Sequence, residues 1–458
     1  MARVVLAAVI LVAIPLHSRA QDAVVHLNVR PMRAPKRALA YQLLPEVREL
    51  NPGNAAQNYL KCFMEQRSFF FTKESATKRT RYQAMPLAEL PLDKLRGYGG
   101  SALQQADWAA RLDTLDWQIL DRIQDGGMDV LPAELGPLQV LATALHVRFR
   151  AEVAARQFDD GVRTAKTLFA LSRHLGEHPT AIANRVGLSA AHLGLSALGE
   201  MVQQPGCPNL YWALTDLPCP LVDLRKGVQG ECTLVAAELK AIRDDSPMPE
   251  AEIEAVVSRL SGVMSLAREQ AGRAPWSMRS RLQAKVKDPA GVAAARRRLA
   301  EAGSPADSVQ RFPSLQAILL DEKRDYVIHR DERIKLLALP LWQIESLIDR
   351  GERTPNGDGL FADFLPQIDN LRRTQGGLEQ EIALLRHVEA LRLHAAEHDG
   401  KLPATLSDIS VPLPLDPVTG KPFLYTVEGA TAHLRGSTNR GAWKDSGLNV
   451  NYEITLQK

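Results

Sequence analysis

The spacing of apolar residues changes near residue 400, and this change restricts the folds that the chain can adopt. From about 45 to 275, apolar side chains recur every three or four residues in long segments joined by short links, the pattern of antiparallel helices. After Gly400 they alternate, as at Phe423, Tyr425 and Val427. The sequence therefore predicts a mostly α fold of irregularly packed helical hairpins with a small C-terminal antiparallel β module.

Helix boundaries are expected where Pro, Gly or Asn interrupts the periodic pattern. One amphipathic helix is predicted over 102–123, because Leu103, Trp108 and Leu112 are followed by further apolar residues at similar spacing. The other long helices are predicted at about 54–70, 137–157, 159–175, 179–203, 222–243, 250–272, 314–350 and 378–398.

Three strands are expected in the β module, because three short runs alternate between apolar and polar residues. These runs are 423–427, 432–434 and 450–456. The segment 413–425, LPLDPVTGKPFLY, leads into the first strand. Asp416 and Pro417 predict a turn there, and Gly420 can adopt the positive φ that such a turn needs.

Shifts in composition suggest a division of the chain into five parts. The first twenty residues have Arg3, then an apolar run of thirteen residues from Val4 to Leu16, then small residues at Ser18 and Ala20. This pattern predicts a secretory signal peptide cleaved after Ala20; the alternative is an uncleaved anchor. The parts are a signal peptide (1–20), a mobile lead-in (21–44), a helical domain (45–272), a basic linker with long helices (273–400) and the small β module (401–458).

The signal peptide predicts an exported protein, periplasmic or extracellular, with no transmembrane segment after cleavage. The chain has 458 residues, of which 45% are hydrophobic and 24% charged, as is usual for a globular protein. Its formal net charge of +3 is too small to indicate nucleic-acid binding. A protein partner or a component of the cell envelope is expected instead.

Four cysteines allow two interpretations, because export permits disulfide bonds. Cys207 and Cys219 stand close together between prolines and could form a bridge that closes a small loop. Alternatively, Cys62, Cys207, Cys219 and Cys232 are four buried thiols that pack as small apolar groups. No pair has the C-x-x-C spacing of a zinc ribbon or a thioredoxin-like centre.

The C-terminal segment resembles the globular head of type II secretion pseudopilins over about 75 residues. There, as here, a long helix ends in a Gly-x-x-Pro element and an Asp-Pro, Gly-x-Pro-aromatic turn leads into a short sheet. The positions that match are Gly400, Pro403, Leu406, Asp416, Pro417, Gly420, Pro422, Phe423 and Tyr425. A prepilin leader, a long apolar assembly helix and the acidic calcium-site cluster are not found in this sequence. The resemblance therefore implies a shared small fold, and neither filament assembly nor calcium binding.

A broader resemblance extends over most of the chain. ALAYQLLPEVRELNPGNAAQNYLKCF and GEHPTAIANRVGLSAAHLGL, together with the C-terminal segment, are similar to an uncharacterised family of exported bacterial helical proteins. AARQFDDGVRTAKTLFALSRHLGEHP also resembles one tetratricopeptide-like helical hairpin, with Phe158 and Gly161 at matching positions and Phe149 where a small residue is expected. No second copy follows at the spacing of such repeats, so a regular array is not expected.

Two segments fit the pattern H-x-x-E-H, in which histidines one turn apart could share zinc and the glutamate could act as a base. The first contains His174, Glu177 and His178. The second consists of the following three residues: His394, Glu397 and His398. Gly176 and Pro179 place the first pattern at a helix end, and the second reads as a polar cap whose histidine favours the helix dipole. No third ligand is identifiable for either, so we assign no metal site.

Other candidate sites have competing structural interpretations. Asp113, Asp116 and Trp117 could bind a sugar between two carboxylates, or they could lie on the solvated face of a helix. The basic run 296–298 could bind an anionic surface, but a solvated helix face is expected. The mixed charges of 321–335 predict an exposed, salt-bridged surface. G-x-S-x-G, G-x-x-x-x-G-K and G-x-G-x-x-G patterns are lacking in the sequence.

The sequence therefore favours an exported, non-enzymatic helical scaffold or interaction protein. We assign no catalytic and no cofactor-binding residue, and we expect no cofactor. The alternative is a zinc-dependent or glycan-directed hydrolase that uses His174, Glu177 and His178, or Asp113 and Asp116. A secretion accessory linked to pseudopilins is a third hypothesis.

Overall fold

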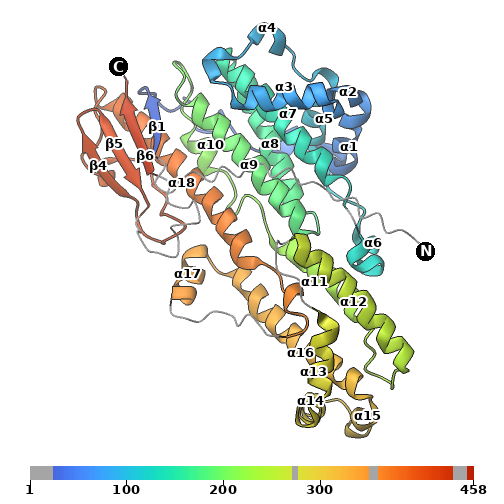
Figure 1. The fold of residues 1–458 in the computed structure, drawn as a ribbon. Coiled ribbons are helices and arrows are strands. Elements are labelled where there is room, and N and C mark those ends of the chain that lie inside the picture. Colours follow the sequence, from blue (N-terminus) through green and yellow to red (C-terminus); the bar gives the residue numbers. More distant parts are fainter. Residues whose placement is uncertain (1–23, 131, 271–276, 350–358, 437–450, 458) are drawn as a thin grey trace.

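The structure is a computed structural model that describes residues 24–130, 132–270, 277–349, 359–436 and 451–457. Helices make up most of these ranges, and a small sheet lies at one side of the elongated molecule (Figure 1). This confirms the predicted fold class. The predicted signal peptide, 1–20, lies outside the described residues. Within the described ranges, no helix has the combination of length and apolar character that crossing a membrane requires.

Three long helices form the centre of the helical body. They are α7 (Leu135–Ala154), α8 (Phe158–Gly176) and α9 (Ala181–Met201), and each packs against the other two. A Cβ on Gly161 would lie 3.1 Å from the Phe149 ring, so the absence of a side chain at this position lets α7 and α8 approach closely. The mismatch of Phe149 with the tetratricopeptide pattern is thereby accommodated at Gly161.

Shorter elements surround this centre, and α18 (Ile368–Glu397) runs from the sheet toward the opposite end of the molecule (Figure 1). Helix α9 packs against both α18 and α11. The remaining helices of this part are α1 (Ala55–Glu65), α2 (Arg67–Phe71), α3 (Lys73–Ala84), α4 (Leu92–Leu95), α5 (Gly100–Ala109), α6 (Leu120–Gly126), α10 (Tyr211–Thr215) and α11 (Arg225–Leu239).

The helix predicted over 102–123 is wrong. Helix α5 ends at Ala109, and the chain then forms strand β3 (Leu112–Thr114), which pairs in parallel with β2 (Asn51–Asn54). The Asp113 carboxylate accepts a hydrogen bond from the Gly53 backbone N–H at 3.0 Å. Such side-chain-to-backbone bonds compete with helix formation, so the apolar spacing alone did not determine the local structure.

A second buried core lies at the far end of the molecule, which we call the arm (Figure 1). It contains the C-terminal part of α11, the first part of α16 and residues 360–365. The helices of the arm are α12 (Glu250–Gln270), α13 (Met278–Val286), α14 (Pro289–Glu301), α15 (Ala306–Arg311) and α16 (Ser314–Ile334). The single helix predicted over 314–350 is divided, because α17 (Leu341–Asp349) begins only after Pro340, which disfavours helical geometry in the residue before it.

The C-terminal sheet has the order β1-β6-β5-β4. The three predicted strands are present as antiparallel neighbours: β4 (Leu424–Glu428), β5 (Thr431–Arg435) and β6 (Asn451–Leu456). Strand β1 (Val24–Val29) pairs in parallel with β6. The structure thus differs from the prediction of a mobile lead-in over 21–44, because its residues 24–29 complete the sheet.

The sheet packs on the helical body. Leu27, Val29 and Ile454 belong to the same buried core as Leu384 and Val388 of α18. Alternate residues of β1 and β6 therefore bury one face of the sheet against the helix. The module is part of the body's core, so it could not be removed without exposing α18.

The turn 413–425 is organised by Asp416, which is fully buried. Its carboxylate accepts hydrogen bonds from the Val418 N–H at 3.0 Å, the Thr419 hydroxyl at 3.1 Å and the Gln380 side-chain amide at 3.0 Å. Gly420 has φ +67°. The predicted turn at Asp416 and the predicted positive φ at Gly420 are both present, and the carboxylate hydrogen bonds add to what was predicted.

Candidate functional site

The first H-x-x-E-H segment forms structural contacts in the helical body. His178 is fully buried, with Nε2 3.2 Å from the Glu134 carboxylate and Nδ1 3.0 Å from the Thr180 hydroxyl. His174 Nδ1 lies 3.0 Å from the Tyr59 hydroxyl. Burial lowers the pKa of His174 to about 4, with a smaller contribution from nearby positive charge. Both imidazoles therefore serve as hydrogen-bonding groups of the core.

Glu177 does not join these histidines. Its carboxylate lies 3.5 Å from the Lys226 ammonium, and its side chain is half exposed. Over the described ranges, no group of three or more His, Cys, Asp or Glu side chains is placed to hold a metal ion. The geometry of the first segment thus gives no support to the zinc hydrolase alternative.

The second segment ends α18. The rings of His394 and His398 stack with their centroids 3.9 Å apart and their planes 8° apart, which is not the converging geometry of a shared metal ligand pair. His398 Nδ1 lies 2.8 Å from the His394 carbonyl oxygen, so it hydrogen-bonds the helix end. Glu397 is exposed. This is the polar helix cap that the sequence predicted.

The proposed sugar site is also used for local structure. The Asp113 carboxylate binds the backbone of β2, and the Asp116 carboxylate accepts from the Gln118 N–H at 2.8 Å. The Trp117 indole N–H donates to the His174 carbonyl at 3.2 Å, and its ring packs edge-on against His178. The prediction that these residues lie on a helix face is wrong, because no helix includes them.

The basic run 296–298 contributes to the arm. Arg296 donates to the Phe312 carbonyl at 2.9 Å, and Arg298 pairs with Asp321 of α16. The run is thus only partly a solvated helix face, because two of its three side chains cross to neighbouring segments.

The four cysteines are unbridged. Cys62, Cys207 and Cys232 are buried, and Cys219 is exposed. Burial raises the pKa of the Cys62 thiol to about 12, which leaves it protonated and unreactive at neutral pH. Of the two interpretations left open by the sequence, buried thiols describe three of the four.

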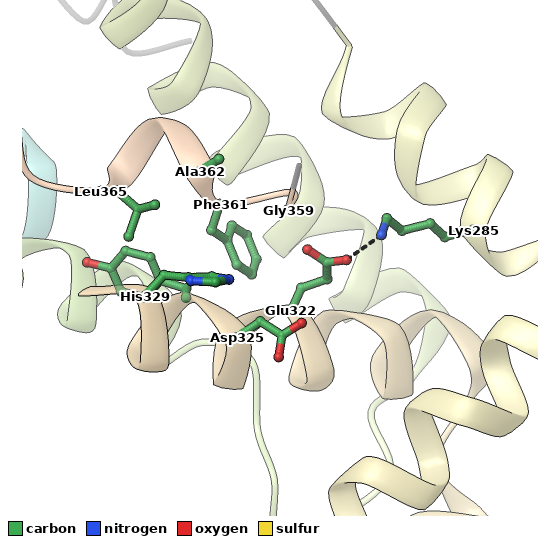
Figure 2. Close-up of a pocket in the computed structure, with 9 residues that line it drawn as sticks. Lys285, Glu322, Asp325, His329, Gly359, Phe361, Ala362 and Leu365 are labelled. Atoms are coloured by element: carbon green, nitrogen blue, oxygen red, sulfur yellow. Dashed lines mark ion pairs between the residues drawn. The ribbon is translucent and has the colours of Figure 1, made fainter. Parts of the chain in front are cut away.

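The arm contains a cavity of about 220 Å³. One wall is formed by α16, which contributes Glu322, Asp325 and His329 (Figure 2). These positions differ by three and four residues, so their side chains lie along one face of the helix. Tyr326 of α16 also lines the cavity, and the remaining lining residues are Lys285 of α13 and Gly359, Phe361, Ala362 and Leu365.

Of the two carboxylates that line the cavity, Glu322 has partners within the described residues and Asp325 has none. The Lys285 ammonium lies 2.6 Å from Glu322 Oε1, and the Leu360 N–H donates to Glu322 Oε2 at 2.6 Å. Asp325 has no hydrogen bond or ion pair with another residue within the described ranges. Burial raises the pKa of Asp325, and the negative charges of Asp321 and Glu322 raise it further.

Sequence reasoning missed this cavity, because it treated 321–335 as an exposed, salt-bridged surface. Asp321 and Glu322 are only 3% and 7% exposed, and Tyr326 is 4% exposed. The available signal was the placement of Glu322, Asp325 and His329 on one helical face. The sequence could not show that α13 and residues 359–365 close over that face.

Comparisons with known proteins do not assign the chain to a family. No protein-family model matches the chain, and neither a curated protein nor a solved structure matches it. The resemblances to an exported helical family and to a pseudopilin head therefore remain predictions, and function has to be argued from the geometry.

Proposed function

We propose that the protein is an exported helical interaction protein that binds a protein partner of the cell envelope at the open edge of its C-terminal sheet. The observation that carries this proposal is the exposed edge strand β4. The predicted signal peptide and the resemblance of the 413–425 turn to a pseudopilin head support the proposal from the sequence.

Strand β4 is the outermost strand of the sheet on its side. No strand within the described ranges pairs with its outer edge. An unpaired edge presents backbone N–H and C=O groups to which an extended segment of another protein can add as a further strand. Many proteins block such edges with lysine or proline. Neither residue type occurs within β4, where Leu424 and Thr426 are exposed.

Apolar surface adjoins this edge. Leu424 is 45% exposed, and Leu415, in the preceding turn, is 55% exposed. Trp342 of α17 is 40% exposed, and its ring lies about 3.0 Å from the position that a Cβ on Gly420 would occupy. When a strand adds to a sheet edge, main-chain hydrogen bonds provide affinity, and contacts with exposed aromatic and aliphatic side chains beside the edge provide specificity.

The test compares wild type with the double variant Leu424→Lys/Thr426→Lys in capture from the native envelope fraction, followed by reconstitution with the identified partner. The matched control is Met64→Lys, which replaces an 84% exposed apolar residue on α1, on the other side of the molecule (Figure 1). Wild type and Met64→Lys should bind equally, and the double variant should bind at least about tenfold more weakly.

Thermal unfolding should show that both variants remain folded, because all three side chains are exposed. Equal binding by the double variant would refute the assignment of the edge. Capture of no specific partner by wild type would refute the interaction proposal itself.

A further inference from the structure

We propose that the cavity of the arm binds a small organic ammonium ion, whose charged group is held by Asp325, beside the Glu322–Lys285 pair, and whose apolar body packs against Phe361. This site is separate from the sheet edge and does not depend on the function proposed above. The cavity has carboxylates at one end and apolar side chains at the other, and its volume suits a small molecule.

The charged end of the cavity already binds one ammonium group, that of Lys285, through Glu322. Asp325 lies one turn further along α16, and both carboxylates lie toward the same end of the cavity (Figure 2). Asp325 makes no ion pair or hydrogen bond to any residue that the structure describes. A partly buried carboxylate without a partner gains most from a cation with N–H donors, because the charge-assisted hydrogen bonds offset its desolvation.

The electrostatic surroundings of Asp325 agree with this reading. Its pKa is raised by burial first and then by Asp321 and Glu322, while Arg298 and Arg324 lower it by less. Arg298 is itself paired with Asp321. A bound ammonium ion would supply positive charge at a carboxylate that already lies near the negative charges of Asp321 and Glu322.

The other end of the cavity is apolar. Phe361 is 1% exposed and Leu365 is 3% exposed, and both line the cavity. Figure 2 shows the Phe361 ring beside the His329 ring, with Leu365 beyond them and the Glu322 carboxylate on the opposite side. An aromatic face next to carboxylates suits an organic cation, because the ring attracts the charge and packs against the carbon atoms.

Size restricts the ligand further. The volume of about 220 Å³ is below the roughly 300–1,000 Å³ of sites for drug-sized molecules, so the cavity suits an amine with one ring or a short chain. A bare metal ion fits less well. Glu322 is occupied by Lys285 and the Leu360 N–H, and the described residues offer no group of three metal ligands.

The probe is phenethylamine, titrated into the full mature chain by calorimetry. The controls are 2-phenylethanol, which has the same ring and no charge, and 3-phenylpropionate, which is an anion. The amine should bind saturably at one site, and the alcohol and the carboxylate should bind at least about tenfold more weakly, since hydrogen bonds to charged groups contribute that much.

The variant is Asp325→Asn, and its matched control is Asp331→Asn. Asp331 lies on the same helix, pairs with Arg330 and is not a cavity residue. Both variants change the net charge equally. Asp325→Asn should lower amine affinity at least about tenfold, whereas Asp331→Asn should leave it unchanged. Because Asp325 has like charges nearby, its variant should unfold at the same temperature as wild type or higher.

Three outcomes would overturn the proposal. They are the absence of saturable amine binding, equal binding of amine and alcohol, and full affinity in Asp325→Asn. If Asp325→Asn should fail to fold, Ala362→Leu, which fills the apolar end, provides the second test, and unchanged amine affinity in that variant would equally overturn the proposal. Loss of binding at the sheet edge would leave this result unaffected.

Discussion

Two ion pairs of buried carboxylates show how differently the body and the arm use charge. In the body, Arg392 of α18 is 1% exposed and lies 2.8 Å from Glu389, which is fully buried. The same guanidinium donates to the backbone carbonyl groups of Arg30, Cys207 and Pro208. Glu389 lies on α18 itself, whereas the three carbonyl contacts of Arg392 join α18 to segments distant in sequence. We call this pair closed, because the protein itself uses the donor groups of the guanidinium.

In the arm, Glu322 is nearly as well buried, but its partner Lys285 is 42% exposed. Asp325 and His329 continue the same helical face into the cavity and have no described partner. The comparison teaches that burial of a charge alone does not indicate function. What distinguishes the two places is whether the neighbouring polar groups are all used by the protein itself.

The largest effect is expected from breaking the closed pair. Arg392→Met would leave Glu389 buried without its countercharge and would remove the guanidinium that donates to three backbone carbonyl groups. We expect a loss of about 3–5 kcal/mol in the free energy of unfolding, measured by urea denaturation. The control is Arg297→Met, on the exposed side of α14, which should change stability by no more than about 0.5 kcal/mol.

The double variant Glu389→Gln/Arg392→Met sharpens this test, because it removes the uncompensated charge. It should recover part of the lost stability. A loss below about 1 kcal/mol for Arg392→Met would contradict the view that Arg392 neutralises Glu389 and joins α18 to its neighbours.

An intermediate effect is expected from pH, through Glu152 of α7. Burial raises the pKa of Glu152 to about 7, against the opposing effect of Arg148 and of the hydrogen bond from Thr164. Between its ordinary value of 4.5 and about 7, the native state binds more protons than the unfolded chain, so stability falls as pH rises through this window. Each pKa unit corresponds to about 1.4 kcal/mol.

Glu152→Gln removes this titration and keeps a hydrogen-bond acceptor for Thr164. The stability of the variant relative to wild type should therefore increase from pH 4.5 to about 7 and then remain level. Urea unfolding of both proteins over this range measures the difference in their free energies of unfolding. The buried histidines are common to both proteins, so their contributions cancel. A difference independent of pH would show that Glu152 is not held in a desolvated site.

The smallest effect is expected from opening the pair in the arm. Lys285→Met removes a half-exposed ammonium from Glu322, which keeps the Leu360 N–H and faces a cavity. We expect a loss of about 1 kcal/mol or less, measured by urea denaturation beside Arg392→Met. If Lys285→Met lowered the free energy of unfolding as much as Arg392→Met, the two ion pairs would not differ in their contribution to stability.

Local patterns in the sequence predicted much of the fold. The turn at Asp416 and the positive φ of Gly420 were predicted, because they follow from local residue preferences. The hydrogen bond that Gln380 of α18 donates to Asp416 was not predicted. The three antiparallel strands followed from alternation alone. The helix expected over 102–123 was lost because the Asp113 side chain binds the β2 backbone, a competitor that apolar spacing does not reveal.

The candidate sites depended on contacts between distant segments. His174 and His178 have the spacing of zinc ligands, but Tyr59, Glu134 and Thr180 occupy their ring nitrogens. The sequence predicted an exposed surface for the residues of α16 that line the arm's cavity. In the structure, α13 and residues 359–365 cover these residues. A sequence pattern records which side chains share a helix face, but it does not record what covers that face.

By itself, the sequence determined the fold class, the change from helices to strands near residue 400 and the position of the turn at Asp416 and Gly420, because each follows from backbone preferences and periodicity over short distances. Tertiary structure alone decided that β1 pairs with β6, that Arg392 is closed among three carbonyl groups and that Asp325 faces a cavity. The physical reason is that desolvation and hydrogen-bond satisfaction depend on neighbours contributed by remote parts of the chain.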